Sequence, residues 1–237
     1  MSLPLEGRVA LVTGASRGLG AATAIELARL GAQVIITART EGGLAETDDA
    51  IRARGLKGAV LLPLDLKEGD KLDALGPSIY QRFHRLDIFV SNAATLGRLT
   101  PAPHILPMDW AEVMAVNLGA AWRLIRSLGP LVQIAEAGRA VFVTCRQGRT
   151  PQAYWGAYGA SKAGIENLAL SWAEEVRGSR LRVNLFDPGP MATRLRATAM
   201  PGEDPATLHR PAEVAPALVE LCLPDERRHG SLVSFNG

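Results

Sequence analysis

Tyr158 and Lys162 lie four positions apart in the segment Tyr158-Gly159-Ala160-Ser161-Lys162. On a helix, this spacing places the phenol and the ammonium group on one face, one turn apart. A free phenol titrates at about pH 10, and a cation about 4 Å away at an effective dielectric of about 20 favours the phenolate by roughly 4 kcal/mol, or roughly three pKa units. The sequence therefore predicts an acid–base pair in which Lys162 lowers the pKa of Tyr158. The alternative is a tyrosine ring that packs in the core while the lysine faces solvent.

A glycine-rich turn follows the first predicted strand, in the segment Thr13-Gly14-Ala15-Ser16-Arg17-Gly18-Leu19-Gly20. Gly14 can adopt a tight turn without Cβ strain. Gly18 and Gly20 let the backbone approach a pyrophosphate and let the next helix pack close to the sheet. The first amides of that helix would face the phosphates. Because the turn stands between a strand and a helix, it predicts nucleotide binding. The alternative is a glycine-rich connection without a ligand.

Charge at the end of the second predicted strand indicates which dinucleotide is bound. An acidic residue there would accept hydrogen bonds from the adenosine ribose. Instead, Ala38 and Arg39 follow the strand, and the glycine turn itself contains Arg17. Two guanidinium groups suit a 2′-phosphate, and no carboxylate is present to repel it. The sequence thus favours NADP(H) over NAD(H), unless both arginines are merely solvated, in which case the preference stays open.

The elements that would position these residues are short apolar runs that alternate with longer helical patterns. Most of the runs are apolar on both faces, as in a sheet that is covered on both sides. They predict seven strands at Arg8–Thr13, Gln33–Thr37, Ala59–Leu64, Leu86–Ser91, Arg139–Thr144, Arg182–Phe186 and Ser231–Phe235. Helices are expected between them at Gly18–Leu30, Glu41–Arg54, Lys67–Phe83, Asp109–Ala137, Trp155–Val176 and Pro211–Cys222. This alternation predicts an α/β fold, with a Rossmann-like, doubly wound sheet of about seven parallel strands and helices on both faces.

No linker or internal repeat divides the chain, so residues 1–237 are predicted to form a single dinucleotide-binding domain. The least regular segment is Met191–Arg210, which is rich in Pro, Gly, Thr and Arg. It follows the sixth predicted strand and is expected beside the crevice at the carboxyl ends of the strands. We interpret it as a mobile substrate lid, with a plain surface loop as the alternative.

The composition is that of a globular protein, with 47% hydrophobic and 21% charged residues among 237. A net charge of +2 is too close to neutral to indicate a nucleic-acid or membrane surface. The two cysteines indicate no disulfide framework, and the four scattered histidines lack metal-ligand spacing. The first residues lack a basic start and an apolar core, and no apolar run approaches the roughly 18 residues of a membrane span. We therefore expect a soluble cytoplasmic protein without a metal, a nucleic-acid partner or a membrane anchor.

Further motifs follow the glycine turn in a set order. Asp65 follows the third predicted strand, Asn92-Ala93-Ala94 the fourth, and Asn117 lies in the long predicted helix. The Tyr158/Lys162 pair comes next, and Pro188-Gly189 follows the sixth strand. In order and spacing, nearly the whole chain resembles the short-chain dehydrogenases/reductases. The stretch 146–155 and the short tail resemble a bacterial oxidoreductase branch of uncertain substrate.

The resemblance implies a role for each of these positions. Tyr158 would give or take the proton of a carbonyl/alcohol pair, Lys162 would lower its pKa and bind the nicotinamide ribose, and Asn117 would hold a water in the proton relay. The other implied contacts with the cofactor are Gly14, Ser16, Arg17, Gly18, Leu19 and Gly20 of the turn, Asp65 and Leu66 at the adenine, Asn92 and Ala93 at the adenosine-side ribose, and Pro188, Gly189 and Thr193 at the nicotinamide and its phosphate, in addition to Arg39 at the 2′-phosphate. Structural alternatives are a helix cap, a helix-interior amide and an ordinary turn. The resemblance also implies a homodimer or homotetramer.

Two positions depart from the family pattern. Ala94 replaces a glycine and adds one methyl group, which should be tolerated. Cys145 occupies the position, thirteen residues before Tyr158, at which the family normally has a serine that holds the substrate oxygen. A thiol is a weaker and bulkier donor, and losing one good donor to a developing oxyanion costs about 10²–10³ in rate, or roughly 2.7–4 kcal/mol. Thr144 would point to the opposite face of the strand and could substitute only if the backbone leaves strand geometry.

Cys145 therefore has three interpretations. It is a weak substitute for the serine, an inert buried hydrophobe, or a reactive thiol whose pKa is lowered by Arg146 and the cofactor. The intact Asn117, Tyr158 and Lys162 favour an NADP(H)-dependent oxidoreductase that interconverts a carbonyl and an alcohol. Cys145 favours the alternative of an impaired NADP(H)-binding sensor or assembly protein. The substrate is not readable from the sequence, although an apolar wall is expected from Tyr154, Trp155 and Met191, and a basic rim for an acidic or phosphate-bearing substrate from Arg146, Arg149, Arg194 and Arg196.

Overall fold

Seven strands lie side by side in one parallel sheet, in the order β3-β2-β1-β4-β5-β6-β7. The computed structural model describes residues 3–235, so the predicted ends at 1–2 and 236–237 lie outside the described residues. The strands are β1 (Val9–Thr13), β2 (Gln33–Ala38), β3 (Val60–Pro63), β4 (Ile88–Ser91), β5 (Arg139–Val143), β6 (Arg182–Asp187) and β7 (Leu232–Ser234). All seven predicted strands are present, with ends that differ by one or two residues. Every residue of β1, β4 and β5 is buried, as their apolar sequences predict.

The chain reverses its direction across the sheet between β1 and β4. It runs outward from β1 to β2 and β3, then returns to β4 on the other side of β1. Ala10 and Val12 of β1 are in register with Ile88 and Val90 of β4. Because parallel strands end at the same edge of a sheet, the loops after β1 and β4 lie next to each other, and ligands bind at such a reversal point.

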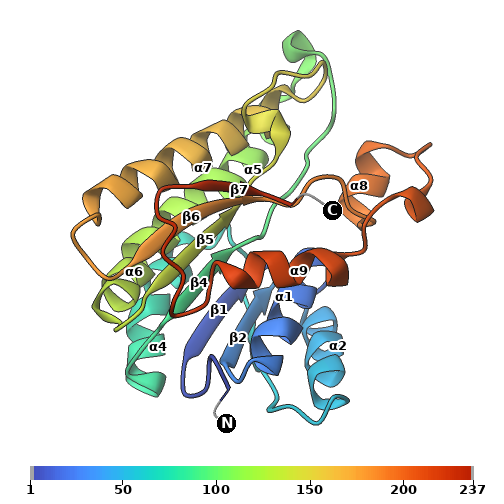
Figure 1. Cartoon of the computed structure of the whole chain (residues 1–237). Helices are drawn as coiled ribbons and strands as arrows, with labels where there is room; N and C mark the ends of the chain where they lie inside the picture. The colour runs from blue at the N-terminus through green and yellow to red at the C-terminus, as the bar shows by residue number, and fades with distance from the viewer. Residues whose placement is uncertain (1–2, 236–237) are drawn as a thin grey trace.

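Helices cover both faces of the sheet (Figure 1). The bounds are α1 (Gly18–Arg29), α2 (Glu41–Arg52), α3 (Gly69–Asp73), α4 (Leu75–Phe83), α5 (Pro107–Met114), α6 (Ala120–Ile134), α7 (Gly156–Glu175), α8 (Arg194–Ala199) and α9 (Pro211–Glu220). One core forms between the sheet and α1, α2 and α9, where α1 and α9 contact each other closely. A second core forms with α4, α6 and α7 and contains the edge-to-face rings of Phe89, Phe142 and Trp172. The prediction of a doubly wound α/β sheet is confirmed.

Two helices that the sequence predicts as continuous are interrupted in the structure. The predicted helix 67–83 divides into α3 and α4 at Ala74, where Gly76 of α4 comes so close to α6 that a Cβ would lie 2.0 Å from the Ser127 carbonyl oxygen. The predicted helix 109–137 divides into α5 and α6 around a π-helical segment, Ala115–Gly119. Such wide turns occur at functional sites, and this one contains Asn117.

The segment 191–210 is more regular than its composition predicts. It contains α8 and a single 3₁₀ turn, Pro205–Thr207. Its two ends are joined, because Met191 and His209 form a parallel bridge and Ala192 N donates to His209 O at 2.9 Å. Arg196 and Glu203 form a bidentate ion pair within it, with both N–O distances 2.6 Å. The segment is thus an internally braced excursion and not an irregular loop, and Figure 1 shows α8 beyond the ends of the central strands.

Within residues 3–235, no helix combines the length and the hydropathy needed to cross a membrane. The same part of the chain contains no group of three or more His, Cys, Asp or Glu side chains placed to hold a metal ion.

Candidate active site

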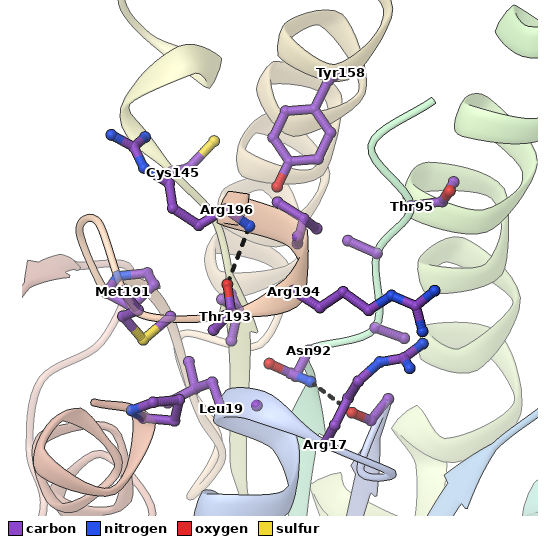
Figure 2. Close-up of a pocket in the computed structure, with 18 of the residues that line it drawn as sticks. Arg17, Leu19, Asn92, Thr95, Cys145, Tyr158, Met191, Thr193, Arg194 and Arg196 are labelled. Carbon is purple, nitrogen blue, oxygen red and sulfur yellow. Dashed lines mark hydrogen bonds between the residues drawn. The ribbon is translucent and has the colours of Figure 1, made fainter. Parts of the chain in front are cut away.

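A cavity of about 820 Å³ opens at the carboxyl ends of β1, β4, β5 and β6. The glycine turn and Arg39 border one end of it, and Cys145, Tyr158 and Lys162 border the other. Figure 2 shows the phenol of Tyr158 pointing into the cavity, with Cys145 on one side and Thr193 and Arg194 across from it. The cavity therefore brings together residues from the loops after β1, β2, β3, β4, β5 and β6 and from α7.

The glycine turn needs its glycines for steric reasons. Gly14 has a positive φ of 65°, and a Cβ there would lie 2.7 Å from the Cα of Ala93. A Cβ on Gly20 would lie 2.4 Å from the Gly14 carbonyl oxygen, so only glycine lets α1 approach the turn this closely. Gly18 has a φ of 59° and no heavy atom within 3.5 Å of a would-be Cβ, the nearest being Thr193 Cγ2 at 3.6 Å. At Gly18, therefore, no side chain covers the backbone of the first turn of α1 on the side of the cavity.

Asn92 and Thr13 fix the loops after β4 and β1 to each other. Thr13 Oγ1 accepts hydrogen bonds from the backbone N–H groups of Asn92 and Ala93, both at 3.0 Å. The Asn92 amide donates to the carbonyl oxygens of Thr13 at 2.9 Å and Gly14 at 3.3 Å. Both of these loops line the cavity. Asn92 thus braces the phosphate turn through its side-chain amide, a structural task that the sequence did not indicate.

The two predicted 2′-phosphate residues lie at the glycine-turn end of the cavity. Arg17 is the N-cap of α1, Arg39 follows β2, and both side chains are exposed. Among residues 3–235, neither guanidinium is paired with a carboxylate. Asp65 and Leu66 line the cavity on the same side, and the Asp65 carboxylate accepts from the backbone N–H of Lys67 at 3.0 Å. This end of the cavity therefore carries positive charge that the protein itself does not neutralise.

Tyr158 and Lys162 lie one turn apart on α7, as their spacing predicts, and both are buried. Tyr158 is 7% exposed and stacks edge-to-face on Trp155, with ring centroids 5.7 Å apart. Lys162 is 2% exposed, donates to the Val143 carbonyl oxygen at 2.9 Å, and holds its Nζ 5.7 Å from the centre of the Tyr158 ring. A lysine that is this deeply buried is not solvent-facing, which rules out the structural alternative stated above.

The pKa of Tyr158 is raised, which is opposite to the direction that the Tyr–Lys spacing predicts. Burial is the main cause, followed by the nearby thiol of Cys145, a hydrogen bond with that thiol, and the charge of Asp187. Burial also lowers the pKa of Lys162, against the opposing effects of Cys145, Glu166 and Asp187. The sequence argument failed because it counted the cation and not the loss of water around both groups. A phenol with a raised pKa keeps its proton at neutral pH but is a weaker acid than a free phenol, so proton donation depends on how well its surroundings stabilise the phenolate.

Cys145 follows β5 and contacts Tyr158 through its thiol. Burial raises the pKa of this thiol, while Lys162 and hydrogen bonds from the backbone of Gln147 and Gly148 oppose the rise. The raised pKa argues against the reactive-thiol interpretation, because a thiolate is the nucleophile. Thr144 does not replace the missing hydroxyl, since its Oγ1 donates to Glu166 Oε1 at 2.5 Å.

Asn117 is buried in the π-helical segment between α5 and α6. Its carbonyl oxygen accepts from Thr95 N at 2.8 Å, and its amide donates to Thr95 O at 3.0 Å and to Ser161 Oγ at 2.9 Å. Ser161 lies between Tyr158 and Lys162 and donates to the Tyr158 carbonyl oxygen at 2.7 Å. The Asn117 side chain thus ties the loop after β4 to the turn of α7 that carries the acid–base pair.

This arrangement was compared with known proteins. Residues 8–204 match the family model for short chain dehydrogenases. The chain belongs to the short-chain dehydrogenase family. It is 38% identical to the uncharacterized oxidoreductase YciK of Escherichia coli, over 94% of this chain and 89% of that protein. It is 35% identical to the 3-oxoacyl-acyl-carrier-protein reductase FabG of Pseudomonas aeruginosa, over 79% of this chain and 75% of that protein.

Solved structures of similar proteins share the whole fold. A short chain dehydrogenase from Pseudomonas syringae superposes with a TM-score of 0.95 at 36% sequence identity. The match covers 99% of this chain and 96% of the Pseudomonas chain. A short chain dehydrogenase from Shigella flexneri in complex with NADP gives a TM-score of 0.93 at 35% identity, with 99% of each chain covered. A short chain dehydrogenase from Escherichia coli in complex with NADPH gives a TM-score of 0.94 at 36% identity, and the match covers 99% of this chain and 98% of that chain. This short-chain dehydrogenase is therefore an oxidoreductase by family.

Most of the residues predicted for the site line the cavity of this short-chain dehydrogenase, but four do not. Gly20 lies beneath the phosphate turn, and Asn117 lies behind α7. Tyr154 is 59% exposed and is no part of the expected apolar wall. Arg149 is bound by two carboxylates, so it is no part of a basic rim. Together with the Arg196–Glu203 pair, this leaves Arg146 and Arg194 as the cations of the proposed rim.

The sequence missed the side chains that cover Tyr158. Leu96 from the loop after β4 and Ala199 of α8 pack against Tyr158 and Trp155, with Leu195 and Met200 beside them. These residues share no motif, because they come from two loops that meet only in the folded protein. Leu195 and Met200 line the tyrosine end of the cavity, whereas Leu96 and Ala199 belong to the buried cluster around Tyr158.

Proposed function

We propose that this short-chain dehydrogenase interconverts a carbonyl and an alcohol with NADP(H), with Tyr158 as the general acid or base. The observation that carries the proposal is the single cavity that joins the cationic phosphate turn to the buried Tyr158–Lys162 pair and Cys145. The solved relatives in complex with NADP and NADPH support this choice of cofactor.

The residues of the cavity fit a phosphorylated dinucleotide. The amides at the start of α1 lack a side-chain cap and face the cavity across Gly18, which suits a pyrophosphate. Arg17 and Arg39, which form no ion pair within residues 3–235, would supply two guanidinium groups for a 2′-phosphate. Asp65 and Leu66 would border the adenine, Ala93 the adenosine ribose, and Pro188, Gly189 and Thr193 the nicotinamide end. The nicotinamide, when bound, supplies or accepts the hydride.

The chain's own residues would handle the proton. Tyr158 holds a phenol proton in the cavity and, in the reductive direction, donates it to the substrate oxygen. Lys162, which is fixed by the Val143 carbonyl, would stabilise the phenolate that is left behind. Asn117 would be a positioning residue, because its amide anchors Ser161 and the loop that contains Thr95. A water held near Asn117 would relay the proton. Cys145 would hold the substrate oxygen as a weak donor in place of a serine.

We also propose that residues 191–210 form the substrate lid. Leu195, Ala199 and Met200 of this segment pack beside Tyr158, and its two ends meet at the Met191–His209 bridge. Because its two ends are joined by this bridge, the whole segment would move as one unit. The Arg196–Glu203 ion pair within the segment would stay intact during that movement.

The preference for NADPH should depend on the two free arginines. For Arg17→Leu and for Arg39→Leu, we expect the Kd of NADPH to rise about tenfold and the Kd of NADH to stay unchanged. A charge-assisted hydrogen bond contributes about 1.5–3 kcal/mol, and the exposure of these two side chains places the effect at the lower end of that range. Fluorescence titration of both cofactors measures this. Arg177→Leu, which removes an exposed arginine from the end of α7, is the control. Equal or tighter binding of NADH by the wild type would contradict the assignment.

Turnover tests the proposed reaction directly. The wild type should oxidise NADPH in the presence of at least one member of a panel of ketones, aldehydes and quinones. Matched neutral and anionic ketones in that panel would also test the basic rim at Arg146 and Arg194. Tight NADPH binding without any turnover would favour the alternative, an NADP(H)-binding sensor or assembly protein.

We further propose that the chain forms a homodimer or homotetramer. Large apolar side chains are exposed on α5, α6 and α7, namely Met108, Trp110, Trp122 and Leu170. Exposed large apolar side chains, when they gather on one face, are typical of a surface that another chain covers. Sedimentation equilibrium should give two or four times the mass of the chain, and Trp122→Glu should shift the distribution toward the monomer. A wild-type monomer would contradict the proposal.

A further inference from the structure

Arg149 joins three elements that meet below the tyrosine end of the cavity. It lies just after the 3₁₀ turn Arg146–Gly148 that follows β5. Its Nη1 donates to Glu166 Oε1 of α7, and its Nη2 donates to Asp187 Oδ2 at the end of β6. The arginine side chain is 32% exposed, whereas those of Glu166 and Asp187 are only 12% and 9% exposed.

Both carboxylates are also tied to residues of the proposed site. Glu166 lies one helical turn after Lys162 and accepts from Thr144 Oγ1, which precedes Cys145. The other oxygen of Asp187 accepts from Gly189 N at 3.0 Å, which fixes the turn proposed for the nicotinamide end. A Cβ on Gly148 would lie 3.0 Å from Glu166 Oε1 and 3.1 Å from the Lys162 carbonyl carbon, so this connection is packed directly against α7.

The charges in this cluster balance. Glu166 and Asp187 carry two negative charges, and Arg149 and Lys162 carry two positive ones. Asp187 acts to raise the pKa values of Tyr158, Cys145 and Lys162, and Glu166 acts to raise that of Lys162. A buried carboxylate that loses its partner is strongly destabilising, and its charge then acts on its neighbours without compensation.

We propose that Arg149 is a positioning residue that holds Glu166 and Asp187 in place and offsets their charge beside the Cys145–Tyr158–Lys162 group. The importance of this for turnover rests on the function proposed above. The electrostatic effect itself does not, because it concerns groups within the protein. Lys162 on α7 and Asp187 on β6 act on the pKa of Cys145, and Asp187 acts on that of Tyr158; Arg149 acts through Asp187, while Arg146, Arg194 and Arg196 also line this part of the cavity.

The thiol of Cys145 gives a readout that needs neither cofactor nor substrate. Iodoacetamide reacts with the thiolate, so the alkylation rate at neutral pH reports the pKa, and the plateau at high pH reports access to the sulfur. Mass spectrometry of peptides would separate Cys145 from Cys222, which is 1% exposed and has its pKa raised by burial to about 12.

Two substitutions that break the same ion pair should move this rate in opposite directions. Arg149→Met leaves the Asp187 charge uncompensated, raises the pKa of Cys145, and should slow alkylation at neutral pH about three- to tenfold. Asp187→Asn removes the negative charge while keeping an acceptor for Gly189 N, and should speed alkylation by a similar factor. Arg149→Lys should return the rate toward that of the wild type, although a single ammonium cannot bridge both carboxylates as a guanidinium does.

Arg123→Met is the matched control, because Arg123 is 34% exposed and forms a comparable ion pair with Asp73 away from the cavity. It should leave the alkylation profile unchanged. A purely structural role for Arg149 would move both test variants in the same direction or alter only the plateau, and either result would overturn the proposal. If Arg149→Met does not fold, Arg149→Lys and Asp187→Asn still provide the comparison. If the two variants shift the alkylation rate in opposite directions but the wild type reduces no carbonyl compound, the proposed reaction is rejected and the proposed role of Arg149 stands.

Discussion

Replacing Tyr158 by phenylalanine should lower kcat for carbonyl reduction about 10²–10⁴-fold while NADPH binding stays unchanged, because a positioned proton donor contributes a factor of that size. The substitution removes the phenol oxygen and keeps the ring that stacks on Trp155. It therefore removes the proton donor without opening a large cavity. Steady-state NADPH oxidation measures the loss, and fluorescence titration measures cofactor binding.

The pH dependence of the wild type gives an independent check. Reduction needs the protonated phenol, and burial raises the pKa of Tyr158 above its usual value. The rate should therefore be flat through neutral pH and fall only in the alkaline range, and Tyr158→Phe should abolish that alkaline fall. Trp155→Phe, which keeps an aromatic neighbour and the phenol, is the control for packing. A kcat for Tyr158→Phe close to that of the wild type would show that another group supplies the proton.

Replacing Cys145 by serine should raise kcat by up to about 10²–10³-fold, the factor that one good donor to a developing oxyanion contributes. The side chain at this position borders the cavity beside Tyr158. A hydroxyl there would donate to the substrate oxygen more strongly than a thiol does. The rise should appear in kcat, because the interaction strengthens in the transition state.

Cys145→Ala separates the interpretations of the thiol. If the thiol is a weak donor, kcat should fall below that of the wild type; if it is inert, kcat should stay the same. Cys222→Ser, which alters the buried second cysteine, is the control. A Cys145→Ser enzyme no faster than the wild type on every carbonyl tested would mean that the family's serine role has no counterpart in this chain.

The elements were predictable where local sequence decides them. The seven strands and their doubly wound order follow from apolar runs that alternate with helical patterns, and the glycine turn follows from its place after β1. The first turn of α9 was also readable, since Arg210 N donates to Glu213 Oε2 at 2.8 Å behind Pro211. The interruption between α3 and α4 was overlooked although Pro77, in the first turn of α4, lacks the N–H that a continuous helix needs; the close approach of Gly76 to Ser127 joins residues far apart in the chain.

The sequence by itself determined the fold, the family and the Tyr158–Lys162 pair, because these depend on residue type and spacing along the chain. Only the tertiary structure decided how those residues titrate and which arginines are free. Burial raises the pKa of Tyr158 where spacing alone predicted a lowering, and Arg149 is committed to Glu166 and Asp187 where composition suggested a basic rim. The physical reason is that desolvation and ion pairing depend on what surrounds a side chain in three dimensions, and most of those neighbours come from other elements.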